Sequence, residues 1–187
     1  MSVINLQKNQ RISLEKPDGT KFTTLSMGLA WDGVSGFLGR ASVDLDASCL
    51  MLNKDKQLVD QVWFRQLDSK CGSIHHSGDN RTGEGSGDDE TIRTNLATLP
   101  AEVEYLVYCV NSFTGQDFSK VENASCRLYD DKGTEQAKFI LSEKGKHTAM
   151  IMVSAYRHGD GWKVKAIGHA TNCQIASQLM QDVQNVI

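Results

Sequence analysis

The part of the chain that decides the fold is TAMIMVSAYR (residues 148–157), followed by HGDG (158–161) and WKVKAIG (162–168). Short apolar runs typical of β-strands lie on both sides of the HGDG segment, whose composition is that of a tight turn. Two such runs around a short glycine-containing turn predict a β-hairpin. The hairpin in turn indicates an antiparallel sheet in the last third of the chain.

Eight further strand-like runs precede this hairpin, with turn signals between them. They cover residues 12–16, 22–31, 42–52, 61–64, 91–96, 103–110, 125–129 and 137–141. The chain also has sixteen glycines and only two prolines. Glycine supplies the positive-φ positions of tight turns. The pattern predicts an all-β chain, namely a β-sandwich of two antiparallel sheets.

The period of the apolar residues changes near the C-terminal end. From Asn172 onward, apolar residues fall at Ile175, Leu179, Val183 and Val186, which is a helical spacing. We expect an α-helix that Asn172 caps and that packs on one of the sheets. No repeat or linker interrupts the sequence, so residues 1–187 are expected to form a single domain.

The composition excludes several classes of protein. The formal net charge is −3, and no block of Lys or Arg stands out, which argues against nucleic-acid binding. We expect no signal peptide and no transmembrane segment, because the apolar runs are too short. The five cysteines include no Cys-x-x-Cys pair, so we expect free thiols and a cytoplasmic protein.

The acidic stretch GDNRTGEGSGDDE (residues 78–90) carries the strongest functional signal. It holds five carboxylates, those of Asp79, Glu84, Asp88, Asp89 and Glu90, against one arginine. Like charges held this close repel one another unless a hard cation neutralises them. The glycines of the stretch allow sharp turns, so that side-chain and backbone oxygens converge. The stretch therefore predicts a metal site.

A second acidic pair lies in the segment DLDAS (residues 44–48). Side chains alternate along a strand, so Asp44, Asp46 and Ser48 share one face. Alone, such residues are more often a solvated face, but beside the glycine-rich stretch they could form the floor of a metal site. The complete set of expected ligands is Asp32, Asp44, Asp46, Gly78, Asp79, Asn80, Gly83, Glu84, Asp88, Asp89 and Glu90, of which Asp32 is the weakest.

The donors in this set are all oxygens, which favours a hard cation. No histidine lies among the carboxylates, so zinc, copper and nickel are disfavoured, and many flexible oxygen donors favour calcium over magnesium. His75 and His76 precede the stretch and are expected at strand or turn positions instead. An EF-hand is excluded because Arg81 and Gly83 stand where its loop needs oxygen ligands.

The sequence resembles the TerD family of tellurite-resistance and stress proteins, and most closely its TerZ-type branch. The matching segments are GLAWD (28–32), DLDAS (44–48), SGDN (77–80), TGEG (82–85), GDDE (87–90), NLATLPAEV (95–103), YRH (156–158), Trp162 and AIG (166–168). Residues 59–67 and 110–116 indicate the branch. The resemblance implies a β-sandwich that binds calcium through these acidic motifs. It also implies a role in tellurite, phage or general stress defence, with protein partners in a membrane-associated complex. Arg81 and Ala30 depart from the family pattern.

Three functions compete on these grounds. We predict a calcium-dependent structural or interaction module and not an enzyme. The first alternative is a metal-assisted hydrolase or phosphotransferase that uses the same carboxylates. It is weakened because no recognisable pair of nucleophile and base accompanies them. The second alternative is direct tellurite chemistry by thiols, for which the chain has no paired, activated cysteine.

Overall fold

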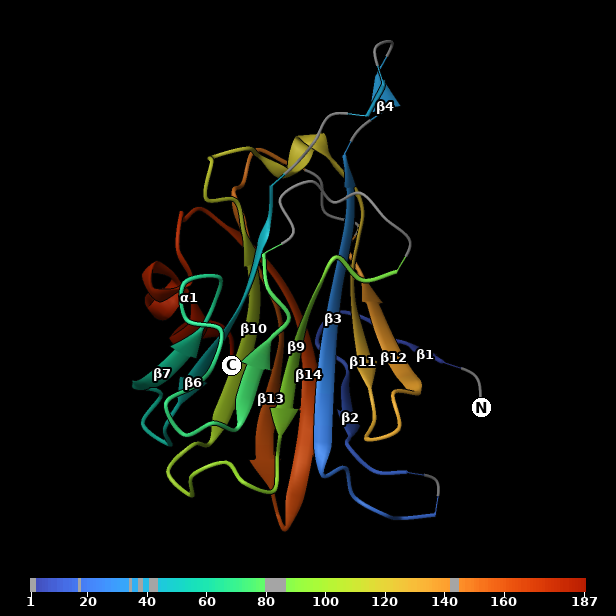
Figure 1. Cartoon of the computed structure of the whole chain (residues 1–187), viewed down its shortest axis with the longest axis vertical. Coiled ribbons are helices and arrows are strands. Elements are labelled where there is room, and N and C mark those ends of the chain that lie inside the picture. Colours follow the sequence, from blue (N-terminus) through green and yellow to red (C-terminus); the bar gives the residue numbers. More distant parts are fainter. Residues whose placement is uncertain are drawn as a thin grey trace.

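The hairpin predicted around residues 158–161 forms, and it joins the two longest strands of one sheet (Figure 1). β13 (Ala149–His158) pairs antiparallel with β14 (Gly161–Thr171), and Gly159 adopts a φ of +60° in the turn between them. The coordinates are a computed structural model that describes residues 3–16, 18–33, 35–36, 39–40, 44–79, 87–141 and 145–187. The hairpin prediction is confirmed.

Two six-stranded sheets pack face to face, as the sequence predicts. The first has the order β1 (Ile4–Asn5), β12 (Glu135–Ile140), β11 (Val121–Tyr129), β3 (Thr24–Gly33), β9 (Glu90–Asn95) and β8 (Ile74–His76). The second has the order β2 (Arg11–Ser13), β14, β13, β10 (Tyr105–Asn111), β6 (Asp46–Leu52) and β7 (Leu58–Val62). β4 (Ser35–Gly36) and β5 (Gly39–Arg40) form a small separate ladder. Strand neighbours pair antiparallel except β1 and β12, which are parallel.

The inner faces of the two sheets form the main core. Along β6, Ala47, Cys49 and Met51 point into this core, whereas Leu50 and Leu52 belong to a second apolar cluster on the outer face of the sheet. This alternation places Asp46 and Ser48 on the outer side, because they share the parity of Leu50 and Leu52. The expected division of faces around Asp46 is therefore confirmed.

The C-terminal segment covers that second cluster. A 3₁₀ turn, η2 (Ala176–Leu179), leads into the helix α1 (Met180–Val186), and Leu179 and Val183 are buried against the outer face of the sheet. The helix packs on a sheet as expected, but the prediction that Asn172 caps it is wrong. The Asn172 side chain instead accepts a hydrogen bond from the Thr148 amide at 3.1 Å, and the helix begins eight residues later.

Several strand boundaries also differ from the expected ones. Of the strand predicted over residues 42–52, the described part forms β6 only from Asp46 onward, so Asp44 precedes it. The strand predicted at 61–64 lies earlier, as β7, and the chain turns at Trp63. A further 3₁₀ turn, η1 (Phe118–Lys120), lies between β10 and β11. No helix in the described ranges is long and apolar enough to cross a bilayer.

Candidate metal centre

The carboxylates of Asp44, Asp46 and Asp79 lie together at one end of the sandwich. One carboxylate oxygen of each residue lies within 4.8 Å of those of the other two. Asp46 opens β6 in one sheet, whereas Asp79 follows β8 in the other sheet. The fold therefore brings one acid of the glycine-rich stretch next to the two strand aspartates. A cation held here would join the two sheets.

Asp46 is the buried member of this group. Its side chain is only 4% exposed, and no hydrogen-bond partner in the described part of the chain reaches its Oδ2 atom. Burial raises the pKa of Asp46 to about 7, and the carboxylates of Glu90, Asp44 and Asp79 add to the rise. A buried carboxylate oxygen without a partner is costly unless it is protonated or binds a cation.

The donor set fits a hard cation. Each of the three carboxylates supplies oxygen, the ligand type that calcium and magnesium prefer. Sulfur and nitrogen ligands are absent from this described cluster, which makes zinc and copper poor candidates. Asp46 Oδ2 is buried and available for a cation, so the residues present fit a calcium ion.

A clamp between the sheets fixes the strand that carries Asp46. Glu90 Oε2 accepts a hydrogen bond from the Ala47 amide at 2.7 Å, and His76 Nε2 lies 3.2 Å from the Ala47 carbonyl oxygen. β7 reaches only as far as the position opposite Cys49, so the backbone of Ala47 lies beyond that pairing. The side chains of Glu90 and His76, which come from the opposite sheet, therefore contact the Ala47 backbone where β7 does not pair with it. His76 and Glu90 are also 3.3 Å apart and almost fully buried.

The same histidine holds the start of the glycine-rich stretch. The Gly78 amide donates a hydrogen bond to His76 Nδ1 at 3.0 Å. Because Nδ1 accepts this bond, the neutral ring carries its proton on Nε2, which faces Ala47 and Glu90. His76 thus connects the residue before Asp79 to the residue after Asp46. It positions two of the three carboxylates relative to each other.

The loop after β10 lies against the other side of the cluster. The Gln116 side-chain oxygen accepts a hydrogen bond from the Asp44 amide at 2.9 Å, and the nearby backbone of Phe113 partly opposes the rise in the pKa of Asp46. Sequence reasoning missed these residues and the His76–Glu90 clamp. The signal for Glu90 is its parity with Ile92 and Thr94, which are buried on the same face of β9.

The other expected ligands that the structure describes have different partners. Asp88 Oδ2 accepts a hydrogen bond from the Tyr129 hydroxyl at 2.6 Å, and its Oδ1 lies 3.3 Å from Arg127 Nε. Asp88 also packs so closely on Gly28 that a Cβ there would lie 2.0 Å from its Oδ2. Its described contacts are thus with protein groups on the outer side of the β3–β11 pair.

Asp32 and Asp89 line a small polar pocket of about 180 Å³ together with Asn123. Asp89 Oδ2 accepts a hydrogen bond from the Trp31 amide at 2.8 Å, and Asp32 accepts one from the Asn123 side chain at 2.8 Å. Burial raises the pKa of Asp89, and the neighbouring carboxylates, first that of Asp32, contribute. The expected ligands Asn80, Gly83 and Glu84 lie outside the described residues.

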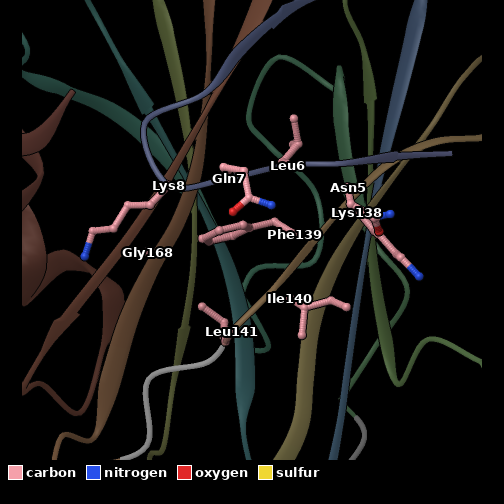
Figure 2. A pocket seen from close by; sticks show the side chains of 9 residues that line it. All are labelled: Asn5, Leu6, Gln7, Lys8, Lys138, Phe139, Ile140, Leu141 and Gly168. Atoms are coloured by element: carbon pink, nitrogen blue, oxygen red, sulfur yellow. The ribbon is translucent and has the colours of Figure 1, made fainter.

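A larger pocket, of about 350 Å³, lies at the β1–β12 edge of the first sheet (Figure 2). Phe139 lies across it and Ile140 stands at its rim, where it is 56% exposed. A Cβ at Gly168, which has a φ of +60°, would lie 2.8 Å from the Phe139 ring. None of the expected metal ligands lines this pocket.

The cysteines do not form a thiol centre. Cys49, Cys109, Cys126 and Cys173 are buried and Cys71 is exposed, and all five are free. Burial raises the pKa of Cys173 to about 11, with a smaller contribution from Asp182, and raises that of the Cys49 thiol further. Buried thiols with a raised pKa are poor nucleophiles at neutral pH. The exposed Cys71 differs, because its partial burial is outweighed by hydrogen bonds from Ser69 and Ser73, which lower its pKa, but it has no second cysteine beside it among the described residues.

We expect replacement of His76 by Ala to destabilise the protein and to weaken any metal binding at the cluster. The change leaves the Ala47 carbonyl and the Gly78 amide without their described partner and removes a neighbour of Glu90. Each buried polar group left unpaired costs on the order of 1–3 kcal/mol, so we expect a loss of about 3 kcal/mol in the free energy of unfolding by urea.

The matched control is His75→Ala on the same strand. His75 is exposed and contacts Asp68 at the surface, so this variant should lose less than about 1 kcal/mol. Equal losses in the two histidine variants would contradict a clamp at His76.

Comparison with known proteins identifies the family of the chain. Residues 1–182 match the model of the TerD domain. The chain is 43% identical to the tellurium resistance protein TerZ of Serratia marcescens, with 99% of each chain covered. It is 38% identical to the stress response protein SCP2 of Bacillus subtilis, with 90% of this chain and 93% of that one covered.

Solved structures show the same fold at lower identity. A TerD homologue, SCO6318 from Streptomyces coelicolor, superimposes with a TM-score of 0.66 at 19% identity, over 85% of this chain and 95% of that one. Because the TerD model matches nearly the whole chain and the tellurium-resistance and stress-response relatives align over 99% and 93% of their lengths, the chain belongs to the TerD family.

Proposed function

We propose that the chain is a stress-response protein that binds calcium between its two sheets and thereby orders a surface for a partner. Asp44 and Asp46 from one sheet and Asp79 from the other would hold the ion. The observation that supports this most directly is Asp46, a buried carboxylate with an oxygen that lacks a described partner, beside two further carboxylates. Calcium would supply the positive charge that this group lacks.

The residues around the cluster set its geometry. The Glu90–Ala47–His76 clamp holds β6 against the opposite sheet, and Gly78 attaches the loop of Asp79 to the same histidine. The loop after β10 approaches through Phe113 and Gln116. An ion at the carboxylates would therefore stiffen three segments at once: the start of β6, the loop after β8 and the loop after β10.

The relatives favour a non-catalytic role. TerZ is named a tellurium resistance protein and SCP2 a stress response protein, and neither name describes an enzyme. By this likeness, the proposed module would act in resistance to tellurium or to general stress. We further propose that it does so with protein partners in a membrane-associated complex. The ordered surface beside the metal cluster would provide the contact.

A thermal and calorimetric titration tests calcium binding. We expect the melting temperature to rise when EGTA is replaced by calcium, because a ligand that binds only the folded state stabilises it. At a hundredfold excess over its dissociation constant, the ion adds about 2.7 kcal/mol. Magnesium should have a smaller effect, because it gives up its water ligands reluctantly. An unchanged melting temperature together with no heat of binding would refute the proposal.

A further inference from the structure

Beside the metal cluster lies a group of large side chains that belongs to neither core cluster. It consists of three aromatic residues, Trp63, Phe64 and Phe113, together with Arg65 and Leu67, and is here called the aromatic tip. Phe64 packs edge-on against Trp63 and Phe113, with ring centroids 4.9 and 5.5 Å apart. Phe113 remains 39% exposed and Leu67 37% exposed, although both are large apolar residues.

Arg65 lies over this group. Its guanidinium carbon is 5.6, 5.2 and 5.1 Å from the ring centroids of Trp63, Phe64 and Phe113. No carboxylate of the described residues forms an ion pair with it. The tip therefore combines an apolar surface with a cation whose donors remain available to an anion.

The tip is built on a surface turn in which Arg65 and Leu67 are exposed and Trp63 and Phe64 are partly buried. Trp63 and Gln66 exchange backbone hydrogen bonds of 3.0 and 2.9 Å, so Phe64 and Arg65 are the two central residues of a tight turn. None of the described pockets is lined by these residues, so the tip offers no pocket for the anchor side chain of a protein partner. The tip can, however, enter the headgroup region of a lipid bilayer, where aromatic rings are enriched and arginine is attracted to anionic lipids.

The tip is connected directly to the metal cluster. The backbone of Phe113 lies near enough to Asp46 to act on its carboxylate, and the Phe113 ring packs on Phe64. On the other side, the Leu67 carbonyl accepts a hydrogen bond from the His76 amide at 2.8 Å. Ordering of the carboxylates would therefore order both segments of the tip.

The charge of the carboxylates determines whether a negatively charged surface can approach the tip. Without a cation, the carboxylates of Asp44, Asp46 and Asp79 lie beside the tip and would repel a negatively charged surface. A divalent ion removes most of that charge and leaves Arg65 to attract anions. We propose that the aromatic tip inserts into the interface of an anionic phospholipid membrane when the neighbouring carboxylates hold calcium. This inference rests on the proposed function.

Sedimentation with vesicles tests it with the full-length chain. The probes are vesicles of phosphatidylcholine alone and of phosphatidylcholine with phosphatidylserine, each in calcium and in EGTA. We expect binding with phosphatidylserine and calcium, and about tenfold less with EGTA or with phosphatidylcholine alone. Trp63 is half-buried whereas Trp31 and Trp162 are buried, so a blue shift of tryptophan emission on binding should report the tip.

Two variants test the residues of the tip. Phe64→Ser should weaken vesicle binding about tenfold, because it removes an apolar side chain from the interface, and Arg65→Gln should weaken it about fivefold. Neither side chain contacts the carboxylates in the described structure, so both variants should bind calcium like the wild type. The control Ile140→Ser changes an exposed apolar residue at the β1–β12 edge and should bind vesicles normally.

Calcium binding is measured by calorimetry on the same preparations without vesicles. If the wild type binds calcium but stays in the supernatant, as it would if the tip served a protein partner, the membrane inference is overturned and the proposed function stands. Vesicle binding that Phe64→Ser and Arg65→Gln leave unchanged also overturns it. If the chain binds no calcium, the proposed function fails, and calcium-dependent insertion fails with it.

Discussion

Replacement of Asp46 by Asn should make the calcium-free protein more stable and remove its response to calcium. At pH 8 the wild-type carboxylate is ionised although it is buried, and its Oδ2 has no described hydrogen-bond partner. An amide carries no charge, so the folded state no longer bears the cost of a buried anion. We expect a gain on the order of 2 kcal/mol in EGTA.

The same change should abolish the stabilisation by calcium, because Asp46 is the most buried of the three clustered carboxylates. The measurement is urea unfolding of both proteins at pH 8, in EGTA and in calcium. The wild type should gain stability on calcium addition, and the variant should have the same midpoint in both solutions.

Asp60→Asn provides a matched control for a buried aspartate. Asp60 is 8% exposed, but its oxygens accept hydrogen bonds from the Lys70 amide at 2.8 Å and the Gln66 side chain at 3.0 Å. Burial opposes ionisation, yet these hydrogen bonds lower the pKa of Asp60. This variant should lose stability and keep its calcium response. An Asp46→Asn protein that still responds fully to calcium would contradict the assignment of Asp46 as a ligand.

Much of the fold could be predicted from local sequence. The strands of the β13–β14 hairpin follow from apolar runs around a glycine turn, and both its existence and the sandwich are confirmed. The helix start could not be predicted, because Asn172 has a competing partner. Its side chain binds the Thr148 amide, which lies 24 residues away and is close only after β13 and β14 pair.

Less of the candidate site than of the fold could be predicted from the sequence. Charge density indicated the acidic segments, and Asp44, Asp46 and Asp79 do lie together. Composition could not show that Asp88 would turn toward Arg127, since that contact depends on the position of β11 beside β3. The clamp was equally hidden, because Glu90 and Ala47 are 43 residues apart and lie in different sheets.

The stability of the calcium-free protein should fall as the pH rises from about 4 to about 7, and calcium should reverse this loss. The pKa of Asp46 is raised from 3.8 to about 7 in the folded state. Between these values the folded chain keeps a proton that the unfolded chain has released. Stability therefore decreases with pH across this window and becomes level above it. For a shift of this size, the contribution is on the order of 4 kcal/mol at most.

Calcium must displace that proton, so its affinity should rise with pH up to about 7 and then level off. Calorimetry in two buffers of different ionisation enthalpy counts the protons released. We expect nearly one proton per ion at about pH 6 and close to none at about pH 8. The Asp46→Asn variant lacks the titrating group, and its calcium-free stability should lose this component of the pH dependence. An affinity that stays constant from about pH 5.5 to 8 would show that the ion does not compete with a proton at Asp46, and would place any calcium site at other carboxylates.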